Sequence, residues 1–398
     1  MDTRQHSELI DRYSARNYAP LPVVISKGKG PWVEDVDGHR YLDMLSAYSA
    51  LNFGHSHPRI VEVFVEQAAK LALTSRAFQN DQFGPFCKEV TELCGQDLVL
   101  PMNTGAEGVE TAIKTARKWG YKVKGVEADK AEIICCQNNF HGRTVTIITF
   151  STDPQFRDGF GPFTPGFKLI PYLDPKALQA AITKNTVALL VEPIQGEGGI
   201  IAPPAGSLKE CYEICRRNNV LFIADEIQTG LGRTGRVFAC DYEGFKPDML
   251  ILGKALGGGL MPVSAVLASK EILGVFNPGD HGSTFGGNPL ACAVARISLK
   301  VLIEEKLPQR AAELGEAFMA RLRTIGGSKI KEVRGKGLLI GIELHEQAGP
   351  AKGFCKKLKD EGLLCKDTVE QVIRLAPPLV IEQKDIDWAF TRIAKVLG

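Results

Sequence analysis

The stretch VLFIADEIQ at residues 220–228 decides the fold, because an uninterrupted apolar run, Val220–Ala224, leads directly into an acidic residue. A strand that is apolar at every position is covered on both faces, and such strands are typical of parallel sheets enclosed by helices. Helical patterns such as Val109–Trp119 and Leu208–Arg217 alternate with the apolar runs. The alternation predicts an α/β fold with a mostly parallel sheet. The other predicted strands are Leu98–Leu100, Glu132–Cys136, Val187–Val191, Met249–Leu252 and Val263–Leu267.

The two ends of the chain do not show the alternation of apolar strands and helices found in its middle. Residues 1–40 look like an extended arm, in which Trp32–Val36 and Arg40–Asp43 flank the hairpin dipeptide Asp37-Gly38. After about Pro289, helical patterns at Leu290–Ile303 and Pro308–Leu322 precede strands at Leu338–Leu344 and Val372–Leu375 and a last helix. This order indicates a smaller α+β domain. The predicted division is an N-terminal segment that joins the small domain, a large domain and a C-terminal small domain, at 1–45, 46–288 and 289–398.

The composition excludes several classes of protein. The 398 residues are 44% hydrophobic and carry a net charge of +2, values typical of a globular protein and not of a nucleic-acid binder. No apolar run approaches the ~20 residues of a membrane span. The N-terminus shows no apolar signal core, so we expect a cytoplasmic protein. Among the 10 cysteines there is no CxxC pair, and HExxH is absent, so we predict reduced thiols and no metal.

Lys254 and Asp225 point to a cofactor. Lys254 follows the strand Met249–Leu252 and precedes a glycine-rich stretch, at the carboxyl end of a strand where open α/β sheets bind ligands. Asp225 ends its own buried strand, where a carboxylate needs a partner because an unpaired buried charge is costly. Pyridoxal phosphate uses both groups, as a lysine Schiff base and as the acid that pairs with its pyridinium nitrogen. Taken singly, either residue also fits a surface turn or a structural ion pair.

The phosphate of such a cofactor needs its own site. Thr104-Gly105-Ala106-Glu107 follows the strand Leu98–Leu100 and opens a helix with capping-box spacing. The amides of such a helix terminus attract anions, although a plain N-cap explains this stretch equally well by itself. Phe140, after the strand Glu132–Cys136, can stack on a pyridine ring or belong to the core.

One motif suggests a different cofactor. GLGRTG at 230–235 fits the GxGxxG pattern of dinucleotide-binding proteins and follows a strand. That pattern works only where a helix begins at once, and the following RVFACDYEG is a poor helix. We therefore reject the nicotinamide interpretation.

Together these stretches resemble the class III, fold type I aminotransferases along essentially the whole chain. The resemblance is carried by VEPIQGEGG (191–199), FIADEIQTGLGRTG (222–235), LGKALGGG (252–259) and HGSTFGGNPL (281–290). It implies a mostly parallel seven-stranded sheet flanked by helices in the large domain. Within the family, the chain is most similar to the ornithine branch, through NYAPLPVV (17–24), AYSALNFGH (47–55), NTGAEGVETAIKTARKWGYKVKG (103–125) and RLAPPLVI (374–381).

The resemblance implies roles around the cofactor ring. Lys254 would be the Schiff-base lysine and the proton carrier, and Asp225 would pair with the pyridinium nitrogen. Gln228 would contact the phenolic oxygen, and Phe140 would stack on the ring. His141 would be among the cofactor-binding residues, in place of a bulkier aromatic found in some ornithine enzymes.

The resemblance also implies a shared phosphate site. Gly105 and Ala106 would offer amides to the phosphate, joined by Ser283 and Thr284 of the partner subunit. A homodimer with shared active sites is therefore expected.

For the substrates, the resemblance implies five further residues. Arg143 would bind the carboxylate remote from the reacting carbon, and Arg374 the carboxylate adjacent to it, as a planar fork suited to such pairing. Glu197 would neutralise Arg374 while ornithine is bound and move away for 2-oxoglutarate. Tyr18 and Tyr48 would surround the α-amino and carboxylate end of ornithine. Without the resemblance, Arg143, Glu197 and Arg374 would each be interpreted as members of structural ion pairs.

The expected reaction is transfer of the δ-amino group of L-ornithine to 2-oxoglutarate by ping-pong kinetics. Its products would be glutamate and glutamate-5-semialdehyde, which cyclises to pyrroline-5-carboxylate. The alternatives are N-acetylornithine, 4-aminobutyrate or putrescine as donor, an aminomutase or racemase, and a non-catalytic protein of the same fold.

Overall fold

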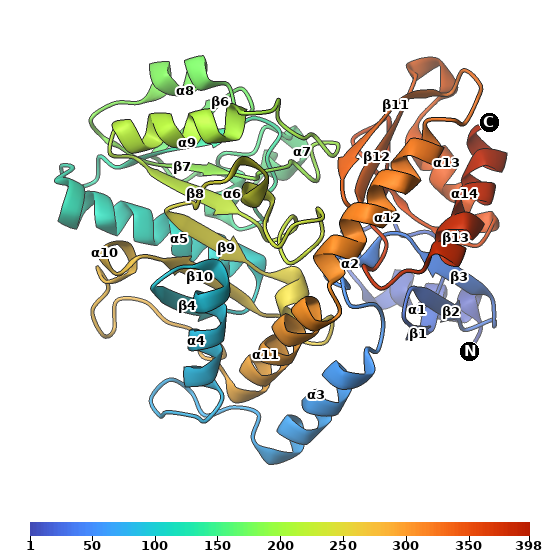
Figure 1. Ribbon diagram of the computed structural model, residues 1–398, viewed down its shortest axis with the longest axis horizontal. Helices are drawn as coiled ribbons and strands as arrows, with labels where there is room; N and C mark the ends of the chain where they lie inside the picture. The colour runs from blue at the N-terminus through green and yellow to red at the C-terminus, as the bar shows by residue number, and fades with distance from the viewer.

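A seven-stranded sheet forms the centre of the computed structural model, which describes residues 1–398. The order of its strands is β4-β10-β9-β8-β7-β5-β6 (Figure 1). Only β10 runs antiparallel to its neighbours, so the predicted mostly parallel sheet is confirmed. The bounds are β4 Leu98–Met102, β5 Glu132–Cys136, β6 Phe167–Ile170, β7 Thr186–Val191, β8 Leu221–Asp225, β9 Met249–Leu252 and β10 Ser264–Ala268.

Helices cover both faces of this sheet (Figure 1). In β7, Leu189 and Val191 join the core that includes helix α9 (Ser207–Arg217), while Ala188 and Leu190 join the core that includes helix α5 (Gly105–Trp119). Alternate side chains of a strand point to opposite faces, which is why every residue of β7 is apolar or buried. Helices α3 (Pro58–Lys70), α4 (Phe83–Cys94) and α11 (Pro289–Glu304) pack together on the α9 side.

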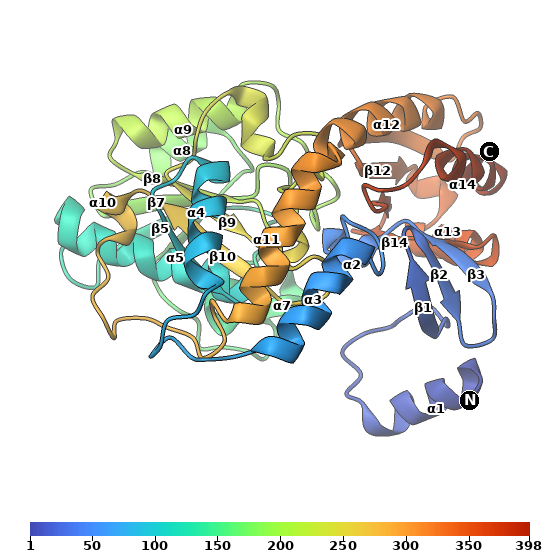
Figure 2. The ribbon, with the colours of Figure 1, turned by 60° about the horizontal axis from the view of Figure 1, so that its bottom comes forward.

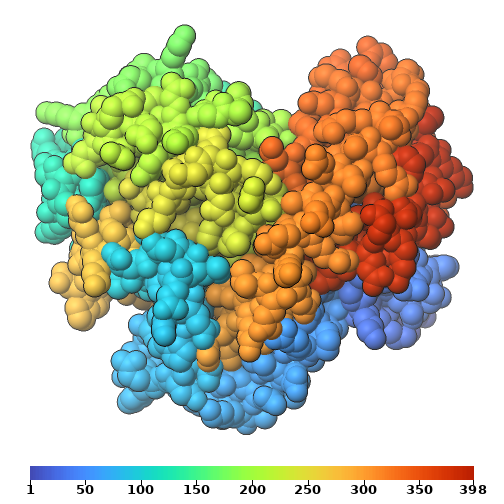
Figure 3. Space-filling model, in the orientation of Figure 1, coloured from blue at the N-terminus to red at the C-terminus, as the bar shows by residue number.

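Two four-stranded sheets lie beside the large one. The first, in the order β11-β12-β15-β14, is antiparallel and is covered by α12 (Leu307–Leu322), α13 (Ala351–Asp360) and α14 (Gln383–Leu397). In the second, β3 pairs in parallel with β13 and so joins residues near the start of the chain to the C-terminal part. A notch separates this lobe from the lobe of the large sheet (Figure 3). The domain boundaries at residues 45 and 288 stay a prediction. The bounds are β1 Ile25–Lys29, β2 Trp32–Asp35, β3 Arg40–Asp43, β11 Ile330–Lys336, β12 Leu339–Leu344, β13 Leu363–Leu364, β14 Lys366–Thr368 and β15 Val372–Leu375.

The expectation of an extended N-terminal arm is wrong for helix α1 (Thr3–Tyr13). The side chains of Asp2 and Gln5 form a capping box that starts this helix, and the sequence pattern S/T/D-x-x-E/Q predicts such a start. Helix α1 has no buried residue and lies at the periphery of the molecule, where the backbone N–H of Thr3 donates to Asp37 (Figure 2). The hairpin at Asp37-Gly38 is confirmed, but with a loop of residues 36–39 between β2 and β3.

The remaining elements are short. Element α2 (Ser46–Ser49) is a single turn of left-handed backbone. The others are α6 Val145–Ile148, α7 Pro154–Arg157, α8 Pro175–Ala181, α10 Lys270–Leu273, the π-helix η1 Gly120–Lys124 and the 3₁₀ helices η2 Ala239–Glu243, η3 Lys254–Gly257 and η4 Glu346–Ala348. All ten cysteines are free, as predicted. None of the helices has the length and apolar character needed to cross a membrane.

Candidate active site

The carboxyl ends of five parallel strands, β4, β5, β7, β8 and β9, meet at one edge of the large sheet. Ligands of open α/β sheets bind at this edge. A cavity of about 210 Å³ lies there, and residues from all of these strand ends line it, predicted ones from every strand end except that of β7. Its lining is Gly105, Ala106, Phe140, His141, Gly142, Glu192, Ile194, Asp225, Ile227, Gln228, Thr229 and Lys254.

Asp225 and His141 form a buried pair on this cavity. Oδ2 of Asp225 lies 2.6 Å from Nδ1 of His141, and Oδ1 accepts a hydrogen bond from the backbone N–H of Ile227. Burial acts to lower the pKa of His141, but the hydrogen bond and the charge of Asp225 outweigh it and raise that pKa. Asp225 therefore presents a buried carboxylate, held by His141 and the N–H of Ile227, at the place where a cationic ligand atom could pair with it.

Glu192 is a site residue that the sequence analysis missed. Its carboxylate accepts the backbone N–H groups of Phe140 and Gly196, at 3.0 and 3.2 Å. Burial raises the pKa of Glu192 to about 7, against the opposing effect of His141. Glu192 directly follows β7, as Asp225 ends β8, so the strand-end argument that identified Asp225 applies to it equally.

Lys254 lies in the first turn of η3, two residues beyond β9, with φ at +43°. Few residues other than glycine adopt such a backbone conformation, and those that do concentrate at functional sites. Burial lowers the pKa of Lys254 to about 8, while the charges of Glu197 and Asp225 partly oppose this effect. Near neutral pH a useful fraction of this amine is therefore uncharged and able to act as a base or a nucleophile.

The predicted anion site is the N-terminus of α5. Thr104 caps the helix and forms a capping box with Glu107, whose N–H it accepts at 3.2 Å. The amides of Gly105 and Ala106 precede the first intrahelical hydrogen bonds and face the cavity. A Cβ on Gly105 would lie 3.1 Å from Cδ1 of Ile227, so the absence of a side chain keeps this end of the cavity open.

A second group of predicted residues forms around Arg374 of β15. The guanidinium of Arg374 pairs with both carboxylate oxygens of Glu197, and its Nη2 donates to Oε2 at 2.9 Å. The carbon Cζ of Arg374 lies 5.0 Å from the ring centroid of Tyr48. The charge of Glu197 also acts on Lys254, whose pKa it partly restores.

Residues 13–397 match a family model described as aminotransferase class-III. The chain belongs to the class-III aminotransferases. An ornithine aminotransferase of Geobacillus sp. (strain WCH70) is 61% identical to it over 396 residues, which cover 100% of this chain and 99% of that protein. The class-III aminotransferases use pyridoxal phosphate, so the predicted family, enzyme class and cofactor are confirmed.

Two solved structures are similar to this class-III aminotransferase along its length. An ornithine aminotransferase of Toxoplasma gondii, in which pyridoxal phosphate partly occupies the active site, is 49% identical with a TM-score of 0.98. The match covers 99% of this chain and 94% of that one. An acetylornithine aminotransferase of Elizabethkingia anophelis is 52% identical with a TM-score of 0.91, over 100% of this chain and 99% of that one. Both matches support the fold type I architecture.

The cavity of this aminotransferase has the chemistry that pyridoxal phosphate needs. Oε1 of Gln228 and Nε2 of His141 are buried without a hydrogen-bond partner, and buried polar atoms of this kind require one. A Cβ on Gly196 would lie 2.1 Å from Oε1 of Gln228, so glycine at this position lets Gln228 occupy its place. The amine of Lys254, the carboxylate of Asp225 and the residues at the N-terminus of α5 therefore line the same cavity.

Seven predicted residues do not line this cavity: Tyr48, Glu197 and Arg374, described above, and Tyr18, Arg143, Ser283 and Thr284. Ser283 accepts a hydrogen bond from Nδ2 of Asn103 at 2.9 Å, and Thr284 is exposed. Tyr18 is also exposed, and together with Tyr48 it lines a second, more apolar cavity of about 480 Å³. The guanidinium of Arg143 lies 3.7 Å from the ring centroid of Phe156 and 5.6 Å from that of Phe140. Within one chain, the predicted site is thus only partly assembled.

The GLGRTG stretch is not a dinucleotide site in this aminotransferase. The next regular element is the short 3₁₀ helix η2, which starts at Ala239, so no α-helix follows Gly235. The sequence analysis is therefore correct in rejecting this motif.

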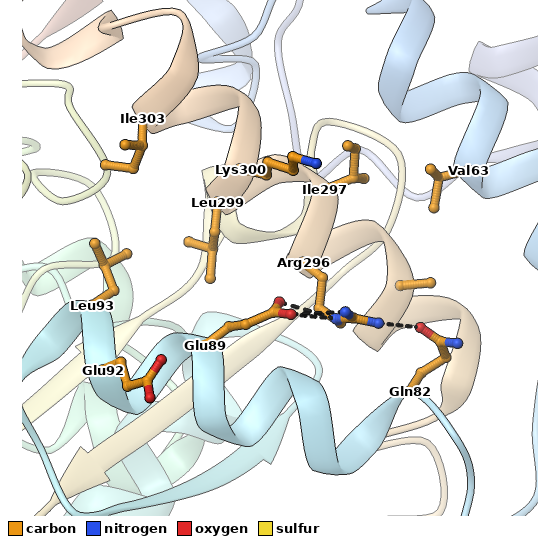
Figure 4. Close-up of a pocket in the computed structure, with 11 residues that line it drawn as sticks. Val63, Gln82, Glu89, Glu92, Leu93, Arg296, Ile297, Leu299, Lys300 and Ile303 are labelled. Carbon is orange, nitrogen blue, oxygen red and sulfur yellow. Dashed lines mark hydrogen bonds and ion pairs between the residues drawn. The ribbon is translucent and has the colours of Figure 1, made fainter.

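A larger cavity, of about 470 Å³, lies between α3, α4 and α11 (Figure 4). None of the predicted site residues lines it. Arg296 of α11 extends across it to Glu89 of α4, with nitrogen–oxygen distances of 2.7 and 3.0 Å, and its Nη1 donates to Gln82 at 2.8 Å. Because these charged groups already pair with one another, this cavity lacks the free groups that a reaction requires.

Proposed function

We propose that this chain is an L-ornithine:2-oxoacid δ-aminotransferase that transfers the δ-amino group to 2-oxoglutarate. The observation that carries the proposal is the arrangement of Tyr48, Arg374 and Glu197, in which an arginine neutralised by a glutamate lies beside a tyrosine. The charge of Glu197 also acts on the amine of Lys254. The similarity to the Geobacillus and T. gondii ornithine aminotransferases supports the same donor. The products are glutamate and glutamate-5-semialdehyde, which cyclises to pyrroline-5-carboxylate.

When bound, pyridoxal phosphate supplies an electron sink that stabilises negative charge on the substrate carbon carrying the amine. The amides of Gly105 and Ala106 hold its phosphate, since a helix N-terminus favours an anion. Asp225, held in place by His141, would pair with the ring nitrogen. The residues that contact the rest of the ring are Phe140, His141 and Gln228.

Lys254 carries the proton in this proposal. Its Nζ accepts a proton from the δ-carbon of ornithine and returns it at a neighbouring position, acting first as a general base and then as a general acid. Burial supports this role, because a pKa of about 8 lies close to the operating pH. An unperturbed lysine would be almost fully protonated there.

The charged residues distinguish the two substrates. Glu197 neutralises Arg374 while ornithine is bound, so that no free cation repels the ornithine amine. For 2-oxoglutarate, Glu197 moves away and Arg374 binds the carboxylate adjacent to the reacting carbon through its planar fork. Arg143 binds the remote carboxylate, and Tyr18 with Tyr48 surrounds the α-amino end of ornithine.

N-acetylornithine is the second candidate donor, since the E. anophelis acetylornithine aminotransferase is 52% identical. Turnover with equal concentrations of L-ornithine and N-acetylornithine, each with 2-oxoglutarate, separates the two. The proposal expects the specificity constant, kcat/KM, for ornithine to be at least tenfold higher, a difference of about 1.4 kcal/mol in transition-state binding. A preference for N-acetylornithine, 4-aminobutyrate or putrescine contradicts the proposed donor, and turnover of ornithine without any 2-oxoacid contradicts a transaminase.

We also propose that the enzyme is a cytoplasmic homodimer with shared sites that serves proline and arginine metabolism. Large apolar side chains are exposed on α1 and elsewhere on the chain, and where such side chains form a continuous patch they mark an interaction surface. Ser283 and Thr284 do not reach the cavity of their own chain, which supports their role at the phosphate of the partner subunit. The exposed apolar residues are Leu9, Ile10, Tyr13, Leu71, Leu73, Phe78 and Phe285.

A further inference from the structure

The turn that carries Tyr48 has an unfavourable backbone conformation. Ser46, Ala47, Tyr48 and Ser49 have φ values of +50°, +45°, +59° and +73°, so consecutive residues with side chains occupy the left-handed region. Left-handed backbone brings Cβ too close to the following carbonyl oxygen, and residues other than glycine adopt it singly rather than in series. Such a turn persists only where its surroundings hold it.

The serine side chains of this turn do not hold it. Oγ of Ser46 and Oγ of Ser49 are buried without a hydrogen-bond partner. The turn is instead fixed at its two ends. At the start, Asp43 accepts the backbone N–H of Ser46 at 2.8 Å and Met44 accepts that of Ala376.

Asn52 fixes the other end of the turn. Its backbone oxygen accepts the N–H of Leu379 at 2.8 Å, and its Nδ2 donates to the backbone oxygen of Leu231 at 2.9 Å. Its Oδ1 accepts a hydrogen bond from Nη2 of Arg233 at 2.7 Å. The turn is therefore attached to the GLGRTG stretch and to the segment that follows β15.

Arg233, the only charged residue of GLGRTG, is completely buried. Besides Asn52, its guanidinium donates from Nη1 to the backbone oxygens of Leu338 and Pro377, at 3.0 and 2.6 Å. Pro377 lies three residues beyond Arg374 on the same segment. A single planar fork thus joins the end of the Tyr48 turn to the segment that carries Arg374.

We propose that Arg233 is a positioning residue that holds the left-handed turn 46–49 and thereby keeps Tyr48 against Arg374. This inference rests on the proposed function, in which Tyr48 and Arg374 meet the substrates. Arginine suits the task because its rigid fork reaches acceptors on separate segments at once, which the single ammonium of lysine cannot do. The GLGRTG motif then acts on the substrate pocket rather than on a nucleotide.

The first test compares holoenzymes with Arg233→Lys and with Arg310→Lys as a matched control. Arg310 also donates to a backbone oxygen of the C-terminal segment, that of Ile381 at 2.6 Å, but touches neither Asn52 nor the turn. In Arg233→Lys we expect kcat/KM for ornithine to fall at least tenfold, with cofactor affinity within twofold of wild type because Arg233 does not line the cofactor cavity. Arg310→Lys should leave both quantities within twofold. An ornithine kcat/KM within twofold of wild type in Arg233→Lys overturns the proposal.

The second test separates a held turn from a general loss of stability. Ala47 is exposed and has the smallest side chain in the turn, and glycine adopts positive φ without penalty. Ala47→Gly added to Arg233→Lys should therefore recover kcat/KM at least threefold, whereas a merely structural defect would gain nothing from it. Absence of recovery overturns the proposal.

Asn52→Ala provides the same test if Arg233→Lys does not fold, because it removes the acceptor of Arg233 and the donor to Leu231 but leaves the bonds of Arg233 to Leu338 and Pro377. The same loss and the same rescue by Ala47→Gly are expected, and normal kinetics or no rescue overturns the proposal. The wild-type reaction with ornithine tests the proposed function separately. If the wild-type enzyme does not react with ornithine, the rate of the half-reaction with 2-oxoglutarate is measured in the same variants instead. That half-reaction also depends on Arg374, so it tests the position of Arg374 without ornithine.

Discussion

Glu197 and Arg374 form a two-point ion pair between residues 177 positions apart in the chain. Arg374 is only 1% exposed, and burial acts to raise the pKa of Glu197. The charge and hydrogen bonds of Arg374 outweigh that effect and hold this pKa below its usual value. Because both groups stay charged, opening the pair exposes a full positive charge inside the pocket, and closing it removes that charge.

Glu197→Gln should shift the preference of the enzyme toward substrates with a carboxylate next to the reacting carbon. The unpaired Arg374 then attracts that carboxylate and repels the ornithine amine. We expect the ratio of kcat/KM for glutamate to that for ornithine to rise at least tenfold, or about 1.4 kcal/mol. Glu343→Gln is the control, since Glu343 pairs with Arg334 outside the cavity. An unchanged ratio would show that Glu197 does not govern Arg374.

Lys254→Ala should lower kcat by at least a thousandfold while the protein still binds pyridoxal phosphate. The variant lacks the group that moves the proton, and general acid–base catalysis supplies about 10²–10⁴-fold. Steady-state turnover with ornithine and 2-oxoglutarate measures the loss. The exposed Lys270 serves for comparison, and Lys270→Ala should retain full activity. Substantial turnover by Lys254→Ala would be incompatible with the assigned role.

The rate at which cofactor-free enzyme captures pyridoxal phosphate covalently should be half-maximal near pH 8 and level off above about pH 9. Only the neutral amine of Lys254 reacts, and burial lowers its pKa from 10.5 to about 8. The neutral fraction is therefore about one half at pH 8 and changes little above about pH 9. Stopped-flow absorbance between pH 6 and 10 measures the profile, with Nα-acetyl-lysine as the reference amine. A rate that keeps rising to pH 10, as it does for the reference amine, would show that the pKa of Lys254 is not lowered.

Mixed dimers of Lys254→Ala and Thr284→Ala subunits should recover activity. If Thr284 serves the phosphate of the partner subunit, a mixed dimer contains one site with both residues intact. Random mixing of equal amounts then gives about a quarter of the wild-type activity, because half of the dimers are mixed and each has one working site. Activity no higher than the average of the two parent variants would show that Thr284 serves its own chain.

The sequence predicts the large sheet well because its strands are buried on both faces. Continuously apolar runs such as Val220–Ala224 and Met249–Leu252 predict buried strands, and their ends identify Asp225 and Lys254. Strand β6 has no such signal, since Phe167–Ile170 lies at the sheet edge and is half-exposed. Residues 3–13 contain few apolar side chains, and helix α1 buries none of them, so no core pattern marks this helix in the sequence.

The site residues that the sequence does not reveal act through distant contacts. Glu192 lies at a strand end and could be found by the argument used for Asp225, but the roles of Arg233 and Asn52 depend on partners 105 to 181 positions away. Left-handed backbone at Ser46–Ser49 has no sequence signal either, because glycine, the residue that usually marks it, is absent there. Only the folded chain brings Arg233 to Asn52, at the end of the turn that carries Tyr48.

The absorption spectrum of the purified protein, recorded before and after addition of L-ornithine alone, tests the central claim most directly. The account predicts a visible band of lysine-bound pyridoxal phosphate that ornithine replaces with the shorter-wavelength band of the aminated cofactor, and that 2-oxoglutarate then restores. N-acetylornithine at the same concentration should react at least tenfold more slowly. A cofactor band that ornithine leaves unchanged would contradict the ornithine δ-aminotransferase assignment while leaving the class-III family intact.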